Sequence, residues 1–285
     1  MLLKEVFHLN PNEMMFKVHE TLLKFSISDF AIIIGLNCAE YPSFCNEDGI
    51  PKQLPFGSSW LCSKYFPGKS SIYRGDLYDF LDQNQVKDDT DAIKLVLIFI
   101  VDYILLSKKD NKLVDKYLWH MVDSLDMFGS FPWGRKSFFL TLEYLKKALK
   151  GKQSDSQQDV IYYKLFGFPT AFQIWIYECF ISLPKTVISY HGPKIPRICS
   201  WSKAFKSNFF SLNEKALPVR NLVPTERECK DLLSCIPEFT GVSSVHKKRP
   251  FSEEELKSDS VQLNVSADLY HFLEPFFFSF FLFKP

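Results

Sequence analysis

The sequence lacks a long apolar run and has almost no net charge. Its most apolar stretch, residues 92–106, is interrupted by Lys94 and Asp102 and is shorter than the ~20 apolar residues that a membrane-spanning helix needs. The formal net charge is +1 at pH 7, so a nucleic-acid-binding role would need a local basic patch. We therefore expect no membrane association, and no binding to nucleic acid through overall charge.

Metal-binding motifs are also missing. The seven cysteines are odd in number and none is spaced as CxxC, which is typical of a reducing, intracellular location, either nucleus or cytoplasm. The closest pairs, Cys38/Cys45 and Cys229/Cys235, are wider than the usual spacing of zinc ligands, and no histidines are spaced as HxxxH. We expect no metal and no cofactor.

Catalytic motifs are equally weak. Cys179, His191 and Asp159 supply the residue types of a thiol protease. Cys179, however, lies in the apolar stretch IYECFI, which is typical of a buried structural thiol. The glycines at positions 129 and 134 enclose proline and tryptophan where a phosphate-binding loop needs free backbone amides. The sequence shows no small-molecule substrate site, and we expect a protein that is not an enzyme.

Apolar residues make up 46% of the chain, which is enough for a large core. Residues 113–149 carry two apolar stripes at helical spacing. We expect these stripes to form two helices joined by a turn at residues 128–135, with the second helix starting at Lys136. The members are Val114, Leu118, Met121, Leu125 and Phe128, followed by Phe138, Leu142, Leu145 and Leu149.

The other patterns predict further short elements. Residues 15–18 and 22–25 are expected to form a β-hairpin, and Ser28 is expected to cap a helix that ends at Gly35. Residues 36–69 read as a loop held to the core by Trp60, Tyr65 and Phe66. Helices are expected at 76–82, 90–107, 170–182 (capped by Thr170) and 226–235, with an irregular segment at 184–201. The predicted fold is mainly α, with a minor N-terminal β-hairpin, in one globular helical domain.

A basic stretch is the best candidate contact surface. Its residues are Arg135, Lys136, Lys146, Lys147 and Lys150. The last three lie at the end of a predicted helix, where the macrodipole alone explains lysines; the alternative is docking of nucleic acid or of an acidic protein. We expect Trp133, Phe168, Trp175 and Trp201 to be structural anchors in the core.

Several motifs resemble, in order and spacing, a plant domain family of unknown function. They are FSISDFA (25–31) with GLNC (35–38) and YP (41–42), YFPGKS (65–70), FGSFPWGR (128–135), GFPTAFQIWIYE (167–178) and ICSW (198–201). The family occurs in transposon-derived proteins, often N-terminal to a ubiquitin-like-protein (SUMO) protease domain. The family has no established biochemical activity, so the resemblance implies little about function. We expect a non-enzymatic interaction module with an unknown protein or nucleic-acid partner. Two alternatives are an accessory domain of a SUMO-specific cysteine protease whose catalytic domain is missing here, and nucleic-acid binding through residues 135–152.

The resemblance and the composition together suggest three segments. Residues 1–220 would be the family's domain, truncated at its N-terminus. Residues 221–268 would be a partly disordered linker, in which Lys247-Lys248-Arg249 could act as a nuclear-import signal. Residues 269–285 form a phenylalanine-rich tail that we expect to be an artefact of the gene model.

Overall fold

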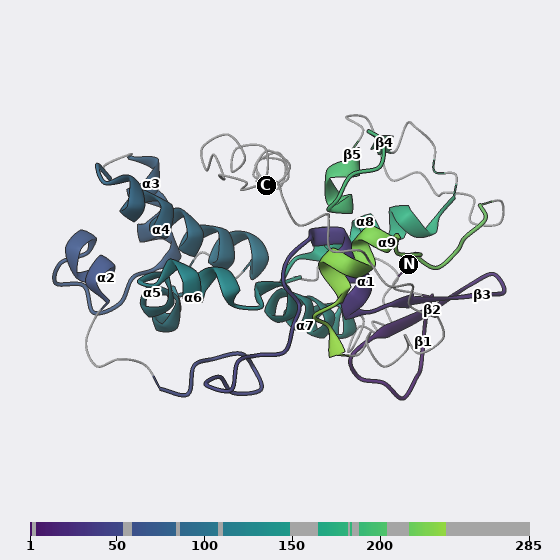
Figure 1. The fold of residues 1–285 in the computed structure, drawn as a ribbon, viewed down its shortest axis with the longest axis horizontal. Coiled ribbons are helices and arrows are strands. Elements are labelled where there is room, and N and C mark those ends of the chain that lie inside the picture. Colours follow the sequence, from purple (N-terminus) through teal and green to yellow (C-terminus); the bar gives the residue numbers. More distant parts are fainter. Residues whose placement is uncertain are drawn as a thin grey trace, which may run out of the picture. The chain divides into compact units, whose positions relative to one another are not determined.

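The computed structural model describes residues 1, 4–53, 59–83, 86–107, 111–148, 165–181, 183, 188–203 and 217–237, all within one compact unit. The fold is mainly helical with a small antiparallel sheet near the N-terminus, which confirms the predicted fold class (Figure 1). Lys150, Asp159, the 247–249 cluster and the tail lie outside the described residues. Among the described helices, none has the length and apolar character needed to cross a bilayer.

The sheet has the order β1-β2-β3, formed by Glu5–Val6, Met14–Val18 and Thr21–Phe25. β2 and β3 are the predicted hairpin, and their register pairs Met14 with Phe25. The tight turn has no glycine; instead His19 adopts a φ of 54°. β1 was not predicted, because a two-residue strand is too short to show alternation.

The sheet packs against three helices to form an aromatic core. These are α1 (Ile27–Ile34), α7 (Trp133–Lys147) and α8 (Pro169–Cys179). Phenylalanine and tryptophan rings with centroids 5–6 Å apart fill the space between them. They come from Phe16, Phe25, Phe30, Phe138, Phe172 and Trp175.

The ends of α1 and α8 differ in part from the prediction. The N-cap of α1 is Ser26 and not Ser28, because the Asp29 carboxylate accepts from the Ser26 backbone N–H at 2.8 Å and completes a capping box. Gly35 ends α1 at a φ of 70°, as expected. Thr170 does not cap α8; the N-cap is Phe168, and Pro169 occupies the first turn, where its missing N–H costs nothing.

A second core brings together five helices and a π-helix. They are α2 (Trp60–Tyr65), α3 (Arg74–Asp82), α4 (Asp89–Phe99), the π-helix η2 (Ile100–Leu105), α5 (Lys116–Val122) and α6 (Leu125–Ser130). The helix predicted at 90–107 is thus α4 followed by η2. The expected loop at 36–69 is wrong at its end, since Ser59 caps α2, and Trp60 is 57% exposed instead of holding the loop to the core.

The turn predicted at 128–135 is much shorter than expected. α6 continues to Ser130, only Phe131 and Pro132 connect it to α7, and α7 begins at Trp133 and not at Lys136. Trp133 belongs to the second core, whereas Phe138 reaches the aromatic core. α7 therefore links the two cores.

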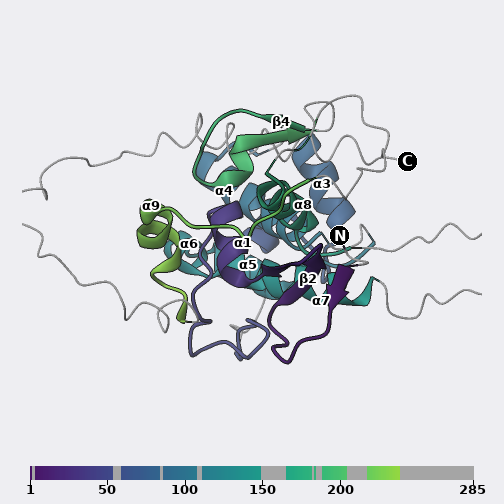
Figure 2. The same ribbon diagram turned by 90° about the vertical axis from the view of Figure 1, so that its right-hand side faces the viewer.

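The segment expected to be irregular contains β4 (Ile188–Tyr190) and β5 (Trp201–Lys203), paired antiparallel, and the 3-10 helix η3 (Arg197–Ser200). After it come α9 (Glu226–Glu228) and the π-helix η5 (Cys229–Leu233), where a short helix was predicted. α9 lies near α1 in both views (Figures 1 and 2), and η5 contacts α1.

Residues 217–237, which we call the strap, are packed onto the domain. The Asn221 amide donates to Leu22 O and its oxygen accepts from Lys24 N, both at 2.9 Å, so it covers the outer edge of β3. Arg197 joins η3 to Glu228 through two hydrogen bonds of 2.7 and 2.8 Å. This packing places residues 221–237 with the domain and not with the linker expected from residue 221.

Candidate binding pocket

The FGSFPWGR motif forms a structural junction between the two cores. Gly134 donates its N–H to Asn37 O at 2.9 Å, and a Cβ at this position would lie 2.5 Å from Cys38 Sγ. Only glycine fits this close approach. The Trp133 indole N–H donates to Phe128 O at 2.8 Å, so its one polar group is satisfied in the core.

The GFPT motif is a second junction. Gly167 has a φ of +81° and donates its N–H to Leu106 O at 2.9 Å. A Cβ there would lie 2.3 Å from the Thr141 hydroxyl oxygen, which accepts from the Phe168 N–H. The motif therefore fixes the start of α8 to α7 and to the end of η2, and its residues contribute packing and not chemistry.

The predicted basic surface is mostly engaged within the protein. Arg135 is buried, and its Nε donates to Cys38 O at 3.0 Å, because the loop after α1 presents its carbonyls there. Lys136 Nζ donates to Asp48 O, Lys146 Nζ to Pro11 O, and Lys147 pairs with Glu143. The burial of Arg135 contradicts its prediction as a partner contact. Lys136, Lys146 and Lys147 each contact another group of the protein, so these described lysines do not form a row of unpaired cations.

The predicted anchors differ in burial. Trp133, Phe168 and Trp175 are buried. Trp201 is only partly buried; it packs on Tyr190 with ring centroids 4.7 Å apart and donates its indole N–H to Glu178. Trp201 thus joins the β4–β5 hairpin to α8.

Burial disfavours the thiolate form of five cysteines. Burial raises the pKa of Cys179 far above its ordinary value, which disfavours the thiolate that a nucleophile requires. Burial also raises the pKa values of Cys45, Cys62, Cys199 and Cys229. Within the described ranges, no group of three or more His, Cys, Asp or Glu side chains could hold a metal ion.

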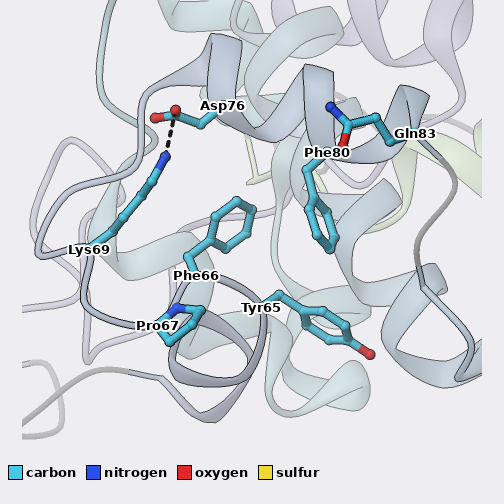
Figure 3. A pocket seen from close by; sticks show the side chains of 7 residues that line it. All are labelled: Tyr65, Phe66, Pro67, Lys69, Asp76, Phe80 and Gln83. Carbon is cyan, nitrogen blue, oxygen red and sulfur yellow. Dashed lines mark hydrogen bonds and ion pairs between the residues drawn. The ribbon is translucent and has the colours of Figure 1, made fainter.

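An open pocket lies between the C-terminal turn of α2 and the exposed face of α3. Figure 3 shows its residues: Tyr65, Phe66 and Pro67 from α2 and the following turn, and Asp76, Phe80 and Gln83 from α3, with Lys69 at one end. The ring centroid of Phe80 lies 5.6 Å from that of Tyr65 and 5.1 Å from that of Phe66. The volume of about 320 Å³ suits one side chain better than a large cofactor.

The polar end of the pocket is an ion pair. Lys69 Nζ lies 2.7 Å from Asp76 Oδ1, and Asp76 Oδ2 accepts from the Tyr73 N–H at 2.9 Å. The hydrogen bond from Lys69, aided by that from Tyr73, holds the pKa of Asp76 below its usual value. Asp76 therefore carries its charge at neutral pH.

A second cation lies beside the pocket, on α2. Lys64 Nζ is 4.5 Å from the centre of the Trp60 ring and 5.1 Å from that of Tyr65, and it pairs with Asp91 Oδ2 at 2.6 Å. The Tyr65 hydroxyl donates to the same carboxylate oxygen at 2.7 Å. Burial opposes the charge of Asp91, but the hydrogen bonds from Lys64 and Tyr65 outweigh it, so the pKa of Asp91 is lowered.

Sequence reasoning missed this pocket. It correctly expected Phe66 at the core, but it placed Tyr65 and Phe66 in a loop and not at the end of a helix that faces α3. One signal was present: residues 76, 79, 80 and 83 recur at helical spacing and mix charged, aromatic and amide side chains. That pattern is typical of a polar aromatic helix face, but nothing in the sequence showed which segment faces it.

The comparisons with known proteins give one match. The model of the family described as "Domain of unknown function (DUF1985)" matches residues 2–144, which include the whole pocket. Neither the curated proteins nor the solved structures contain a match.

Proposed function

We propose that this chain, which belongs to the DUF1985 family, is a non-catalytic protein-interaction module whose contact site is the α2–α3 pocket. The observation that carries the proposal is an open pocket whose lining includes aromatic side chains of α2 and α3. Tyr65 and Phe80 are partly exposed, Phe66 is largely buried, and the neighbouring Trp60 is 57% exposed. Exposed aromatic side chains around a hollow are typical of protein contact sites.

The state of the thiols and of the basic helix supports this proposal over its alternatives. Cys179 is buried with a raised pKa, which disfavours nucleophilic catalysis. The described basic side chains of α7 are bound to carbonyls and to Glu143, which disfavours a phosphate-binding stripe. A peptidase activity lost on Cys179→Ser, or DNA retention lost on Lys146→Glu with Lys147→Glu, would contradict the proposal.

The resemblance adds a proposed context, a plant transposon-derived protein. In that setting the module could bring partners to a SUMO-protease domain encoded downstream. Sequencing the genomic frame beyond residue 285 tests this point. A frame without protease motifs would remove the accessory role, while the module's binding role would stand.

Photo-crosslinking tests the contact site directly. A benzoylphenylalanine at position 60 should crosslink a partner protein in a nuclear or cytoplasmic extract, whereas the same group at Tyr190, which is 54% exposed, should not. Adding Asp79→Arg, at the exposed position of α3 next to the pocket residue Phe80, should reduce the crosslink at position 60. Equal crosslinking at both positions, or no effect of Asp79→Arg, would refute the assignment.

A further inference from the structure

We propose that the α2–α3 pocket binds the side chain of an arginine in a basic peptide segment of the partner; this inference rests on the proposed function. Three features support it: the aromatic walls of the pocket, its charge, and the position of Lys64, a cation of α2 that already lies near aromatic rings and a carboxylate.

The walls suit a flat cation. Tyr65 and Phe80 present partly exposed rings, and the largely buried Phe66 ring also lines the pocket (Figure 3). The Phe80 centroid lies 5.6 Å from that of Tyr65 and 5.1 Å from that of Phe66. The face of an aromatic ring is electron-rich and attracts cations. A guanidinium is planar and weakly hydrated, so it stacks on such rings more readily than an ammonium does.

The charge of the pocket favours a cation as well. Asp76 and Asp79 stand three residues apart on α3, on the stripe that also carries Phe80 and Gln83. Asp79 is exposed, and Lys69 is the positive side chain that lines the pocket. Lys69 and Asp76 line the pocket and offset each other, whereas Asp79 does not line it but lies on the same side of α3. Asp79 therefore leaves a net charge of −1 near the rings, which a bound arginine would neutralise.

The Lys64 cluster is an internal example of the same chemistry. Lys64 Nζ lies over the Trp60 and Tyr65 rings and pairs with Asp91. This surface thus holds one cation between aromatic rings and a carboxylate, and Tyr65 belongs to both groups. An anionic side chain, in contrast, would face the ring surfaces and both carboxylates, and the lysine available to it is already paired with Asp76.

The test is an NMR titration with two blocked peptides, Gly-Gly-Arg-Gly-Gly and the same peptide with citrulline, the neutral isostere of arginine. The arginine peptide should bind in the millimolar range and shift the amide signals of Lys69, Asp76 and Gln83. The citrulline peptide should bind about tenfold more weakly, because its hydrogen bonds lose their charge.

Variants that change one charge test whether the arginine peptide binds at the α2–α3 pocket. Asp79→Asn should weaken binding of the arginine peptide by about two- to fivefold, the range expected of an exposed charge pair. Lys69→Met should strengthen it by a similar factor, because Asp76 loses its internal cation. Lys17→Met is the matched control: Lys17 is an exposed lysine on β2, paired with Glu20 at 3.5 Å, and its removal should change nothing. Thermal melting confirms that each variant is folded.

Several results would overturn the inference: no binding of the arginine peptide, equal binding of the citrulline peptide, or weaker binding after Lys69→Met. Binding of a blocked glutamate peptide that is lost in Lys69→Met would assign the pocket to an anion. If the crosslink at position 60 persists while the two peptides are not distinguished, only this inference fails. If the crosslink is also absent, the proposed function fails with it.

Discussion

The buried ion pair between Arg74 and Asp102 gives the sharpest stability prediction. Arg74 opens α3, Asp102 lies in the π-helix η2, and their side chains are 1% and 0% exposed. Arg74 Nε lies 2.6 Å from Asp102 Oδ2, Nη2 donates to Asp102 O at 3.0 Å, and the guanidinium lies 3.8 Å from the centre of the Tyr103 ring. We expect Arg74→Met and Asp102→Leu each to destabilise the fold strongly, and the double variant Arg74→Met/Asp102→Leu to cost far less than their sum.

The magnitude follows from the environment of the pair. At an effective dielectric constant of about 20, two unit charges at this distance attract by about 6 kcal/mol. Removing two ions from water costs several kcal/mol each, so the intact pair contributes little net stability. Removing one partner leaves the other charge buried and uncompensated, which costs about 3–5 kcal/mol. The double replacement removes both charges and should cost less than either single change.

The assay is urea unfolding followed by tryptophan fluorescence, with the free energy of unfolding of all four proteins combined in a double-mutant cycle. Lys69→Met with Asp76→Asn is the comparison, because that pair is 48% and 29% exposed and should couple by no more than about 1 kcal/mol. If Arg74→Met and Asp102→Leu each cost under 1 kcal/mol and add, the two charges are solvated and this packing of α3 on η2 is wrong.

Three further predictions concern the junctions and the cap of α1. Trp133→Ala should lower the free energy of unfolding by ~3–5 kcal/mol as a core truncation; a near-neutral result in urea unfolding would mean that the indole is exposed. Gly134→Ala should destabilise by about 1–3 kcal/mol, since its Cβ would meet Cys38 Sγ at 2.5 Å, whereas Gly129→Ala, with nothing within 4 Å, should be neutral or stabilising; equal melting temperatures would contradict the close approach. Burial raises the pKa of Asp29 to about 6 against hydrogen bonds from Ser26. Its protonated form is therefore favoured by folding, so this contribution is complete below pH ~4 and is lost, by about 3 kcal/mol, as pH rises through 6. Asp29→Asn should flatten that part of the stability–pH curve, and unchanged slopes in wild type and variant would refute the assignment.

The sequence predicted correctly those features that depend on residues close together in the chain. The hairpin followed from alternation at 15–18 and 22–25, and the end of α1 followed from Gly35, the residue that best tolerates a positive φ. The cap was misplaced by two residues, because Ser26 and Ser28 are equally good candidates until the position of the Asp29 carboxylate is known. The deciding contact is local, a capping box between residues three positions apart, and the same box was not sought for Ser26.

Elements that depend on distant contacts were missed or wrongly bounded. The π-helix η2 leaves no mark in a 3.6-residue periodicity, yet it contains Asp102, the buried partner of Arg74. α2 was hidden among prolines and glycines, and its Trp60 faces solvent although its type predicts burial. The candidate site depends on two facts that the sequence did not show: residues 60–65 form the helix α2, and α3 packs beside it. Only with both known are Tyr65 and Phe80 recognised as neighbours.

The position of the two cores also explains why the most specific motifs did not mark the site. FGSFPWGR and GFPT lie where α7 joins the cores, and Gly134 and Gly167 are required by backbone contacts at Asn37 and Thr141. Yet the family match ends at residue 144, while the aromatic core is closed by Phe172 and Trp175 of α8 and the edge of β3 by Asn221 of the strap. The matched region therefore contains the pocket and its whole supporting core, but the sheet end of the domain depends on residues beyond the match. Conditions that loosen α8 or the strap should accordingly affect the aromatic core first, and the α2–α3 pocket, which rests on the second core, last.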